Sequence, residues 1–283
     1  MNLSVFLSAY NENLAETPAS SARIYTSTYM RHWNVWKTPQ LNALFGGVLK
    51  KKGNSYKLQG ELTNYVTGIC NVTCAESPYN QSDQSDYDIS SDGSALVFLR
   101  KTRACRWRTT PLTSSTTCRS AALVSTKDAI LINGRGTTRY PETQGAAVYP
   151  RFSPDGSKIS YLQMNGIAYE SDRSILYVAN AKPAGEGSNV TRLAGNGDRS
   201  LDSSAWSTDS KTVYVSAPDL GRDRIFPIPL TARDDYVPKD ITNEGVSAGL
   251  YVLPSGDLLV SDSKIWSSRN IFSVSPTGND VRT

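Results

Sequence analysis

The sequence predicts an all-β protein, and more specifically a partial β-propeller of about five four-stranded blades with the first and last blades incomplete. Three observations support this prediction. Short runs of alternating apolar and polar residues recur between Gly, Pro, Ser and Asp residues. No window sustains the apolar spacing of a capped helix. One hairpin-like segment is repeated along the chain.

The repeated segment combines a short strand, a tight turn and a second strand rich in β-branched and aromatic residues. Asp and Gly suit this turn because they tolerate left-handed or locally hydrogen-bonded backbone. The turn positions recur at intervals of a propeller blade, about 40–45 residues, lengthened by loop insertions. The four copies cover 87–99, 149–162, 204–215 and 250–260, with turns at Asp92, Asp155, Asp209 and Ser255.

Further strands are expected outside each hairpin. Third strands are predicted at 121–124, 175–178, 224–228 and 270–274, and fourth strands at 129–132 and 189–193. Residues 3–9 resemble the second strand of a blade, followed by strands at 41–45 and 56–58. Little room for a fourth strand remains after 274. The predicted blades of this incomplete domain, 1–283, are approximately 1–64, 82–135, 147–195, 202–243 and 248–283.

The two ends of the predicted propeller do not complement each other. Both supply second and third strands, so they cannot complete one blade together, and open sheet edges would remain. We therefore expect the chain to be an excerpt from a longer propeller.

Composition and charge exclude several function classes. Charged residues make up 20% of the chain, and the net charge is +4. The densest basic run, Lys50–Lys52, leads directly into Gly53, as in a solvated hairpin tip, and no module motif accompanies it. We therefore predict no nucleic-acid partner. No apolar stretch approaches the roughly 20 residues that cross a bilayer, so no membrane partner is predicted either.

Cysteines and glycosylation sequons favour an oxidising, secretory environment. The four cysteines are Cys70, Cys74, Cys105 and Cys118, and with a single histidine they make a zinc site improbable. Sequons at Asn71, Asn80 and Asn189 are candidate glycosylation sites in loop-like stretches; a fourth lies at Asn2. The N-terminus has no basic region and only a short apolar patch, so it does not resemble a signal peptide.

Four stretches resemble the fungal dipeptidyl-peptidase V group of the prolyl oligopeptidase family. The resemblance is collinear and covers nearly the whole chain. The stretches are Tyr29–Pro39 with Asn42–Phe45, Glu76–Pro78 with Asp86–Ser90, Phe152–Met164 with Tyr169–Arg173, and Leu258–Ser261.

This resemblance implies a secreted serine peptidase that removes dipeptides from peptide N-termini. Its members join a propeller to an α/β-hydrolase domain that carries the catalytic Ser, Asp and His. The chain contains no stretch matching that domain, so we predict that it binds or gates peptide substrate, contacts the hydrolase domain and is inactive alone. The alternative is a stand-alone propeller that binds a peptide or protein.

One motif imitates a catalytic serine. Gly245–Gly249 matches G-x-S-x-G, which requires an apolar strand before the serine and a helix after it. A polar loop precedes Ser247, a strand is expected after Gly249, and the only histidine, His32, lies far upstream. We interpret Ser247 as a loop residue and His32 as a packing residue, and assign no catalytic residue. The absence of a Gly-rich phosphate loop predicts no nucleotide cofactor.

The connections between second and third strands are expected to be long and to share one face of the propeller. They are 10–40, 101–119, 163–174, 218–223 and 263–269. Loops on a rigid scaffold collect binding residues. A carboxylate there would hold a peptide α-ammonium through a charge-assisted hydrogen bond, with aromatic rings beside it. The candidate substrate-binding residues are Glu170, Tyr169, Arg173, Trp33, Trp36 and Glu76.

Alternatives remain for several of these residues. Glu170, Asp172 and Arg173 could instead form an ion-paired loop, and Trp33 and Trp36 could pack between domains. Cys105 and Cys118 bracket one long connection, which favours a disulfide between them. The pairing of all four cysteines stays open.

Overall fold

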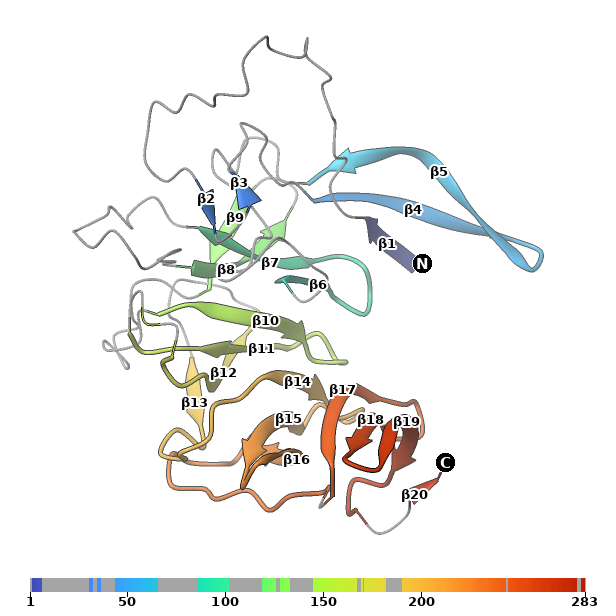
Figure 1. Cartoon of the computed structure of the whole chain (residues 1–283). Helices are drawn as coiled ribbons and strands as arrows, with labels where there is room; N and C mark the ends of the chain where they lie inside the picture. Colours follow the sequence, from blue (N-terminus) through green and yellow to red (C-terminus); the bar gives the residue numbers. More distant parts are fainter. Residues whose placement is uncertain are drawn as a thin grey trace, which may run out of the picture.

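The computed structural model contains a series of antiparallel β-sheets. It describes residues 2–6, 31–32, 35–36, 44–65, 86–101, 119–125, 128–132, 145–166, 169, 171–181, 190–242, 244–278 and 281–282. Figure 1 shows the sheets succeeding one another in sequence order, and they do not close into a ring. No α-helix occurs within these residues.

The first two sheets come from the N-terminal half of the chain. The first contains three strands, and the second contains four, each in sequence order. β2 and β3 pair as a separate two-stranded antiparallel sheet. The strands are β1 (Asn2–Phe6), β4 (Phe45–Lys52) and β5 (Ser55–Asn64); β6 (Tyr87–Ile89), β7 (Leu96–Lys101), β8 (Arg119–Ser125) and β9 (Asp128–Leu131); and β2 (Arg31–His32) with β3 (Val35–Trp36).

The other three sheets form the C-terminal part. Each is again a meander, with four, three and four strands. Their strands are β10 (Ala147–Phe152), β11 (Lys158–Gln163), β12 (Ile175–Asn180) and β13 (Thr191–Leu193); β14 (Ser203–Trp206), β15 (Thr212–Asp219) and β16 (Arg222–Pro229); and β17 (Val246–Val252), β18 (Leu258–Lys264), β19 (Ser267–Val274) and β20 (Val281–Arg282).

The first strands of successive sheets contact one another, as the inner strands of propeller blades do. β10 lies against β6 and β14, and β14 lies against β17. Side chains add hydrogen bonds across these contacts. Asp88 Oδ2 accepts the Phe152 backbone N–H at 2.8 Å, and Trp206 Nε1 donates to the Arg151 carbonyl at 3.2 Å. These bonds fix the sheets' mutual orientation.

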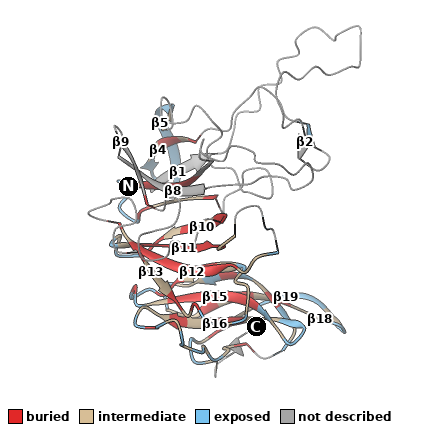
Figure 2. Cartoon of the chain, turned by 90° about the vertical axis from the view of Figure 1, so that its left-hand side faces the viewer, coloured by how far each residue is buried: buried red, intermediate tan, exposed pale blue. Residues whose placement is uncertain are grey.

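The core lies between neighbouring sheets, and strand alternation divides it. On β11, Ile159 and Tyr161 belong to the cluster shared with the second sheet, whereas Leu162 belongs to the cluster shared with the fourth. β12 divides its residues in the same way. Figure 2 shows this burial concentrated in the strands of the third and fourth sheets. A sheet buried on both faces is a rigid support for its loops.

Several strand predictions need correction. The strand expected at 41–45 lies at Phe45–Lys52, because it pairs with β1 at one end and continues into the hairpin with β5. The last sheet does have a fourth strand, since Val281 and Arg282 pair with β19. The predicted turn after Lys52 is confirmed.

Two of the long connections expected between second and third strands are in fact tight turns. Leu220–Gly221 joins β15 to β16, and Ile265–Trp266 joins β18 to β19. Leu220 and Gly221 have φ values of 50° and 75°, the left-handed pair that matches the twist of a two-residue hairpin. The connection between β11 and β12 has the predicted extent.

Candidate functional site

The candidate site lies at the ends of the sheets that carry the β11–β12, β15–β16 and β18–β19 connections. We call this end the loop face and define it by the described residues 164–166, 169, 171–174, 194–202, 220–221 and 265–266. Backbone contacts hold its parts together across the third and fourth sheets. Leu201 N–H donates to the Ser174 carbonyl at 3.1 Å, and Ser174 N–H donates to Ser200 Oγ at 3.2 Å.

Arg173 anchors the β11–β12 loop to the connection that leads into the fourth sheet. Its guanidinium donates to the Gly195 carbonyl at 2.8 Å and also to the Gly197 carbonyl. Asp172 shapes the same loop, because its carboxylate accepts the N–H groups of Gly166 and Arg173. The Arg173 guanidinium therefore already has backbone partners in this structure.

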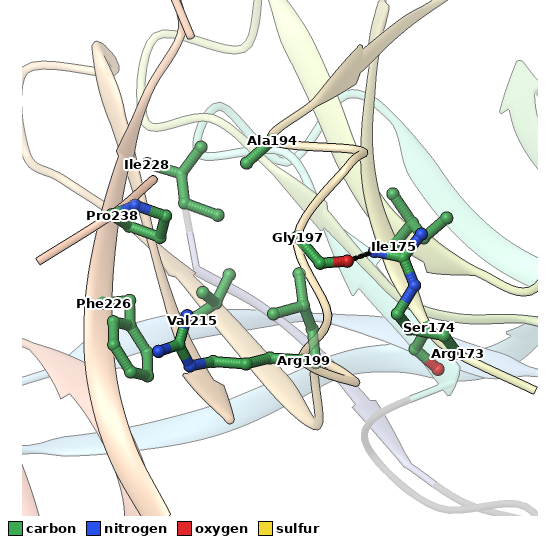
Figure 3. Close-up of a pocket in the computed structure, with 11 residues that line it drawn as sticks. Arg173, Ser174, Ile175, Ala194, Gly197, Arg199, Val215, Phe226, Ile228 and Pro238 are labelled. Atoms are coloured by element: carbon green, nitrogen blue, oxygen red, sulfur yellow. Dashed lines mark hydrogen bonds between the residues drawn. The ribbon is translucent and has the colours of Figure 1, made fainter. Parts of the chain in front are cut away.

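A small pocket opens beside Arg173, between the third and fourth sheets (Figure 3). Aliphatic and aromatic side chains form most of its wall, and two arginines border it. The lining residues are Arg173, Ser174, Ile175, Ala194, Gly197, Arg199, Leu201, Val215, Phe226, Ile228 and Pro238.

Arg199 belongs to a chain of ion pairs that continues from this pocket. It lies 2.7 Å from Asp219, and Arg224 lies 3.3 Å from Asp219 and 2.7 Å from Asp240. The Arg199 guanidinium also stands 4.9 Å from the centroid of the Phe226 ring. Networked ion pairs hold their side chains more firmly than isolated surface pairs do. The network therefore rigidifies the end of β15 and its connections.

The loop face also exposes large apolar side chains at the tips of three successive sheets. The exposed fractions are 60% for Tyr169, 89% for Leu220 and 79% for Trp266, and Ile265 is fully exposed. Single exposed apolar residues are common, but several on one face indicate an interaction surface.

The predicted site residues fall into two groups. Tyr169 and Arg173 lie on the loop face, and Trp36 lies in β3 with 41% of its surface exposed. Outside the described residues lie Trp33, Glu76 and Glu170, the cysteine pair Cys105 and Cys118, and the sequon residues Asn71, Asn80 and Asn189. Their roles stay predictions.

Sequence reasoning missed Arg199, Asp219 and Leu220. Leu220–Gly221 was assigned to a long loop, although a residue followed by Gly between two apolar runs is itself a hairpin signal. The partnership of Arg199 with Asp219 had no sequence signal, because the two residues come from different connections.

Ser247 is a strand residue, which corrects its assignment to a loop. It lies in β17, is 2% exposed, and its hydroxyl lies 3.2 Å from Thr242 Oγ1. Gly249, with φ of 64°, marks a β-bulge opposite β18, and the strand continues beyond it. A nucleophile elbow instead exposes its serine between a strand and a helix. The local geometry therefore does not match that motif.

The described residues contain no group of three His, Cys, Asp or Glu side chains placed to hold a metal ion. They likewise contain no helix whose length and hydropathy would carry it across a bilayer.

Comparison with known proteins finds fungal relatives named dipeptidyl-peptidase 5. No family model matches this chain. It is 41% identical over 274 residues to "Dipeptidyl-peptidase 5" of Aspergillus fumigatus, a match covering 95% of this chain. It is also 41% identical over 281 residues to "Probable dipeptidyl-peptidase 5" of Aspergillus clavatus. This chain is a relative of dipeptidyl-peptidase 5. The predicted family resemblance is confirmed.

The match to dipeptidyl-peptidase 5 covers only part of the relatives. The chain spans 36% of the Aspergillus fumigatus protein and 37% of the Aspergillus clavatus protein. The resemblance to dipeptidyl-peptidase 5 therefore applies to this portion of the relatives and not to their whole length.

Solved structures confirm the predicted fold. The β-propeller domain of the trilobed protease from Pyrococcus furiosus superposes with a TM-score of 0.53 at 11% identity, covering 85% of this chain and 60% of that one. A putative dipeptidyl aminopeptidase IV from Bacteroides ovatus gives 0.52 at 11% identity, covering 84% and 38%. At these identities the likeness supports the propeller architecture and nothing finer.

Proposed function

We propose that this chain supplies the propeller portion of a secreted serine dipeptidyl-peptidase, whose loop face contacts the α/β-hydrolase domain and helps to admit and bind peptide substrate. The observation that carries this proposal is the set of exposed Tyr169, Leu220, Ile265 and Trp266 side chains on one face. The name of the relatives supplies the reaction class. Catalysis itself is assigned to the hydrolase domain.

The loop face suits a contact with a second domain. Its apolar tips offer surface to bury, while the Arg199–Asp219–Arg224 network keeps the supporting loops in one arrangement. Interdomain contacts that exclude water from apolar groups are stabilised by about 25 cal/mol for each Å² buried. A rigid rim also restricts which peptides enter between the domains.

Within this site, Glu170 is proposed to bind the substrate α-ammonium, with Tyr169 beside it. Trp33, Trp36 and Glu76 remain candidates for the same cavity. Arg173 is proposed to act as a positioning residue, because its guanidinium is bonded to the Gly195 and Gly197 carbonyls. Secretion, and glycosylation at Asn71, Asn80 and Asn189, complete the proposal.

The decisive experiment uses the enzyme in which this chain is joined to its hydrolase domain. We expect Leu220→Ser combined with Trp266→Ser to lower kcat/KM for a chromogenic dipeptide substrate by about tenfold, because about 1.4 kcal/mol of interdomain contact is lost. Tyr251→Ser is the matched control, since Tyr251 is 62% exposed but lies in β17 away from the loop face. Equal activity of all three proteins would contradict the proposed contact.

Two further measurements separate binding from folding. Glu170→Gln should raise KM with little change in kcat, because the lost charge acts on the bound ammonium. The isolated chain should not hydrolyse the substrate. Turnover by the isolated chain would show that it carries its own catalytic residues, and unchanged KM would remove Glu170 from the binding role.

A further inference from the structure

The hairpin formed by β4 and β5 extends away from the other sheets and concentrates positive charge (Figure 1). Gly53 and Asn54 join its strands, with Gly53 at a φ of 62°. Four lysines gather near this turn, and Glu61 is the only acidic residue between positions 44 and 65. All four are exposed; they are Lys50, Lys51, Lys52 and Lys57.

The register of the hairpin places like charges together. Lys50 lies directly opposite Lys57. Like charges at directly opposed positions destabilise a strand pair. Among the residues that the structure describes, no acidic side chain forms an ion pair with these lysines. The tip is therefore suited to an acidic partner that relieves this repulsion.

The hairpin has two chemically different faces, because side chains alternate along a strand. Tyr56 and Leu58 share one face and are 51% and 47% exposed. Leu58 lies opposite Leu49, which extends the apolar face onto β4. Lys50, Lys52 and Lys57 occupy the other face. Lys51 lies opposite Tyr56, at the edge of the apolar face, so three of the four lysines gather on one side of the ribbon and the exposed apolar side chains on the other.

β5 is also the outermost strand of its sheet. The strand order is β1–β4–β5, and no described strand pairs with the second edge of β5. Every residue from Ser55 to Thr63 is exposed. An exposed edge of this length offers a row of backbone N–H and C=O groups to an incoming extended peptide.

From these features we propose that the outer edge of β5 binds an extended polypeptide strand in which acidic and apolar residues alternate. Main-chain hydrogen bonds would add the strand to the sheet. Its acidic side chains would face Lys57 and Lys50, and its apolar side chains would cover Tyr56 and Leu58. Edge lysines discourage pairing with neutral or basic strands, so they select this partner by charge. The proposal does not depend on the proposed peptidase function.

Binding of a fluorescent eight-residue peptide of alternating Glu and Val to the full chain tests this proposal. We expect saturable binding that weakens as salt is raised, because surface charge pairs are screened. Backbone amides of β5 should exchange hydrogen more slowly in the complex. Lys57→Glu should weaken binding by about tenfold or more. Lys239→Glu, at an exposed lysine in the connection before β17, is the matched control and should leave affinity unchanged.

Two modified peptides distinguish strand addition from charge attraction. N-methylation of alternate amides keeps the charge but removes donors along one edge, so it should abolish binding. A polyglutamate of equal length should bind more weakly, because it lacks the apolar side chains. Equal binding of polyglutamate, retained binding of the N-methylated peptide, or no slowing of exchange in β5 would each overturn the proposal.

Discussion

The recurrence of Ser and Asp in the turns has a specific hydrogen-bonding cause. In the second, third and fourth sheets, a serine hydroxyl donates to the aspartate two residues later, at 2.5–2.6 Å. The serine oxygen also accepts the N–H five residues ahead, at 2.9–3.0 Å. The turn therefore satisfies its own backbone, which explains why the motif was visible in the sequence. The pairs are Ser90–Asp92, Ser153–Asp155 and Ser207–Asp209.

The turns are also bonded to one another. Ser91 Oγ donates to the Pro154 carbonyl at 2.8 Å, and Asp155 N–H donates to Ser210 Oγ at 3.2 Å. Ser210 adopts a φ of 59° at the position where the turn of the third sheet has Gly156. Its contact with Asp155 offsets part of the cost of a left-handed serine. Sequence comparison of the turns alone could not show this link between sheets.

We predict that acid weakens the fold through these turns. Hydrogen bonds from Ser153 and Ser207 lower the pKa of Asp155 and Asp209 below the ordinary aspartate value. A depressed carboxyl pKa stabilises the fold above the unfolded-state pKa, and that contribution disappears as pH falls through the folded-state pKa. Urea-unfolding midpoints should therefore fall as pH is lowered below about 4.

The variant Asp209→Asn, and the buried carboxyls of Asp88 and Asp202 whose pKa shifts in the other direction, separate the causes of this pH dependence. Asp209→Asn should show a smaller acid loss than the parent chain, and an equal loss would remove Asp209 from the explanation. Burial raises the pKa of Asp88 and Asp202. These two groups destabilise the fold when ionised, so their contribution to the free energy of unfolding becomes more favourable as pH falls through their raised pKa values. Those two groups act at higher pH than the turn carboxylates, which separates the two effects.

At the scale of single elements, tertiary packing decides where strands end. β15 continues through Pro218, which lies opposite Asp223 in the register, and ends only at Asp219. The sequence predicted a long connection at 218–223, whereas the strand continues through Pro218, a residue type that usually interrupts a central strand. Packing also decides the conformation of the connection after β13, because it leaves no room for a side chain at Gly195.

Substitution of Gly195 tests how closely this connection is packed. A Cβ there would lie 2.6 Å from Asp234 Oδ1 and would also collide with Arg192. These two side chains form an ion pair at 2.8 Å that joins β13 to the loop after β16. We expect Gly195→Ala to destabilise the chain by about 1–3 kcal/mol in urea unfolding.

Gly197→Ala is the control for this substitution. A Cβ at Gly197 would meet only the Ala194 carbonyl, at an ordinary 3.4 Å. Its unfolding midpoint should stay close to that of the parent chain. Similar losses in both variants would mean that general backbone rigidity, and not the Arg192–Asp234 pair, sets the effect.

At the scale of the whole molecule, stability comes from apolar layers between successive sheets. Val213 and Val215 pack toward the third sheet, whereas Tyr214 packs toward the fifth. This alternation is the period-two pattern that the sequence displayed. The layers make each sheet depend on its neighbours, as in other repeat architectures.

Ile159 and Ile271 test this layered arrangement. Ile159 is fully buried between the second and third sheets, whereas Ile271 is 68% exposed on β19. Ile159→Ala should cost about 2–5 kcal/mol because it leaves a cavity, and Ile271→Ala should change stability by less than about 0.5 kcal/mol. Denaturant unfolding of both variants measures the difference. A comparable loss at Ile271 would show that this face is covered in solution.

The sequence by itself determined the all-β class, the repeated hairpin and the relationship to dipeptidyl-peptidase 5. The all-β class and the repeated hairpin depend on local hydrogen bonding and on alternation within short segments, whereas the relationship was indicated by collinear stretches that resemble the family. Only the tertiary structure decided that Arg173 bonds to the Gly195 carbonyl, that Arg199 pairs with Asp219, and that Leu220 and Trp266 stand exposed on two-residue turns. These contacts depend on the lengths of separate connections and on the positions that the packed sheets give them. No single segment of the sequence encodes either the lengths or the positions.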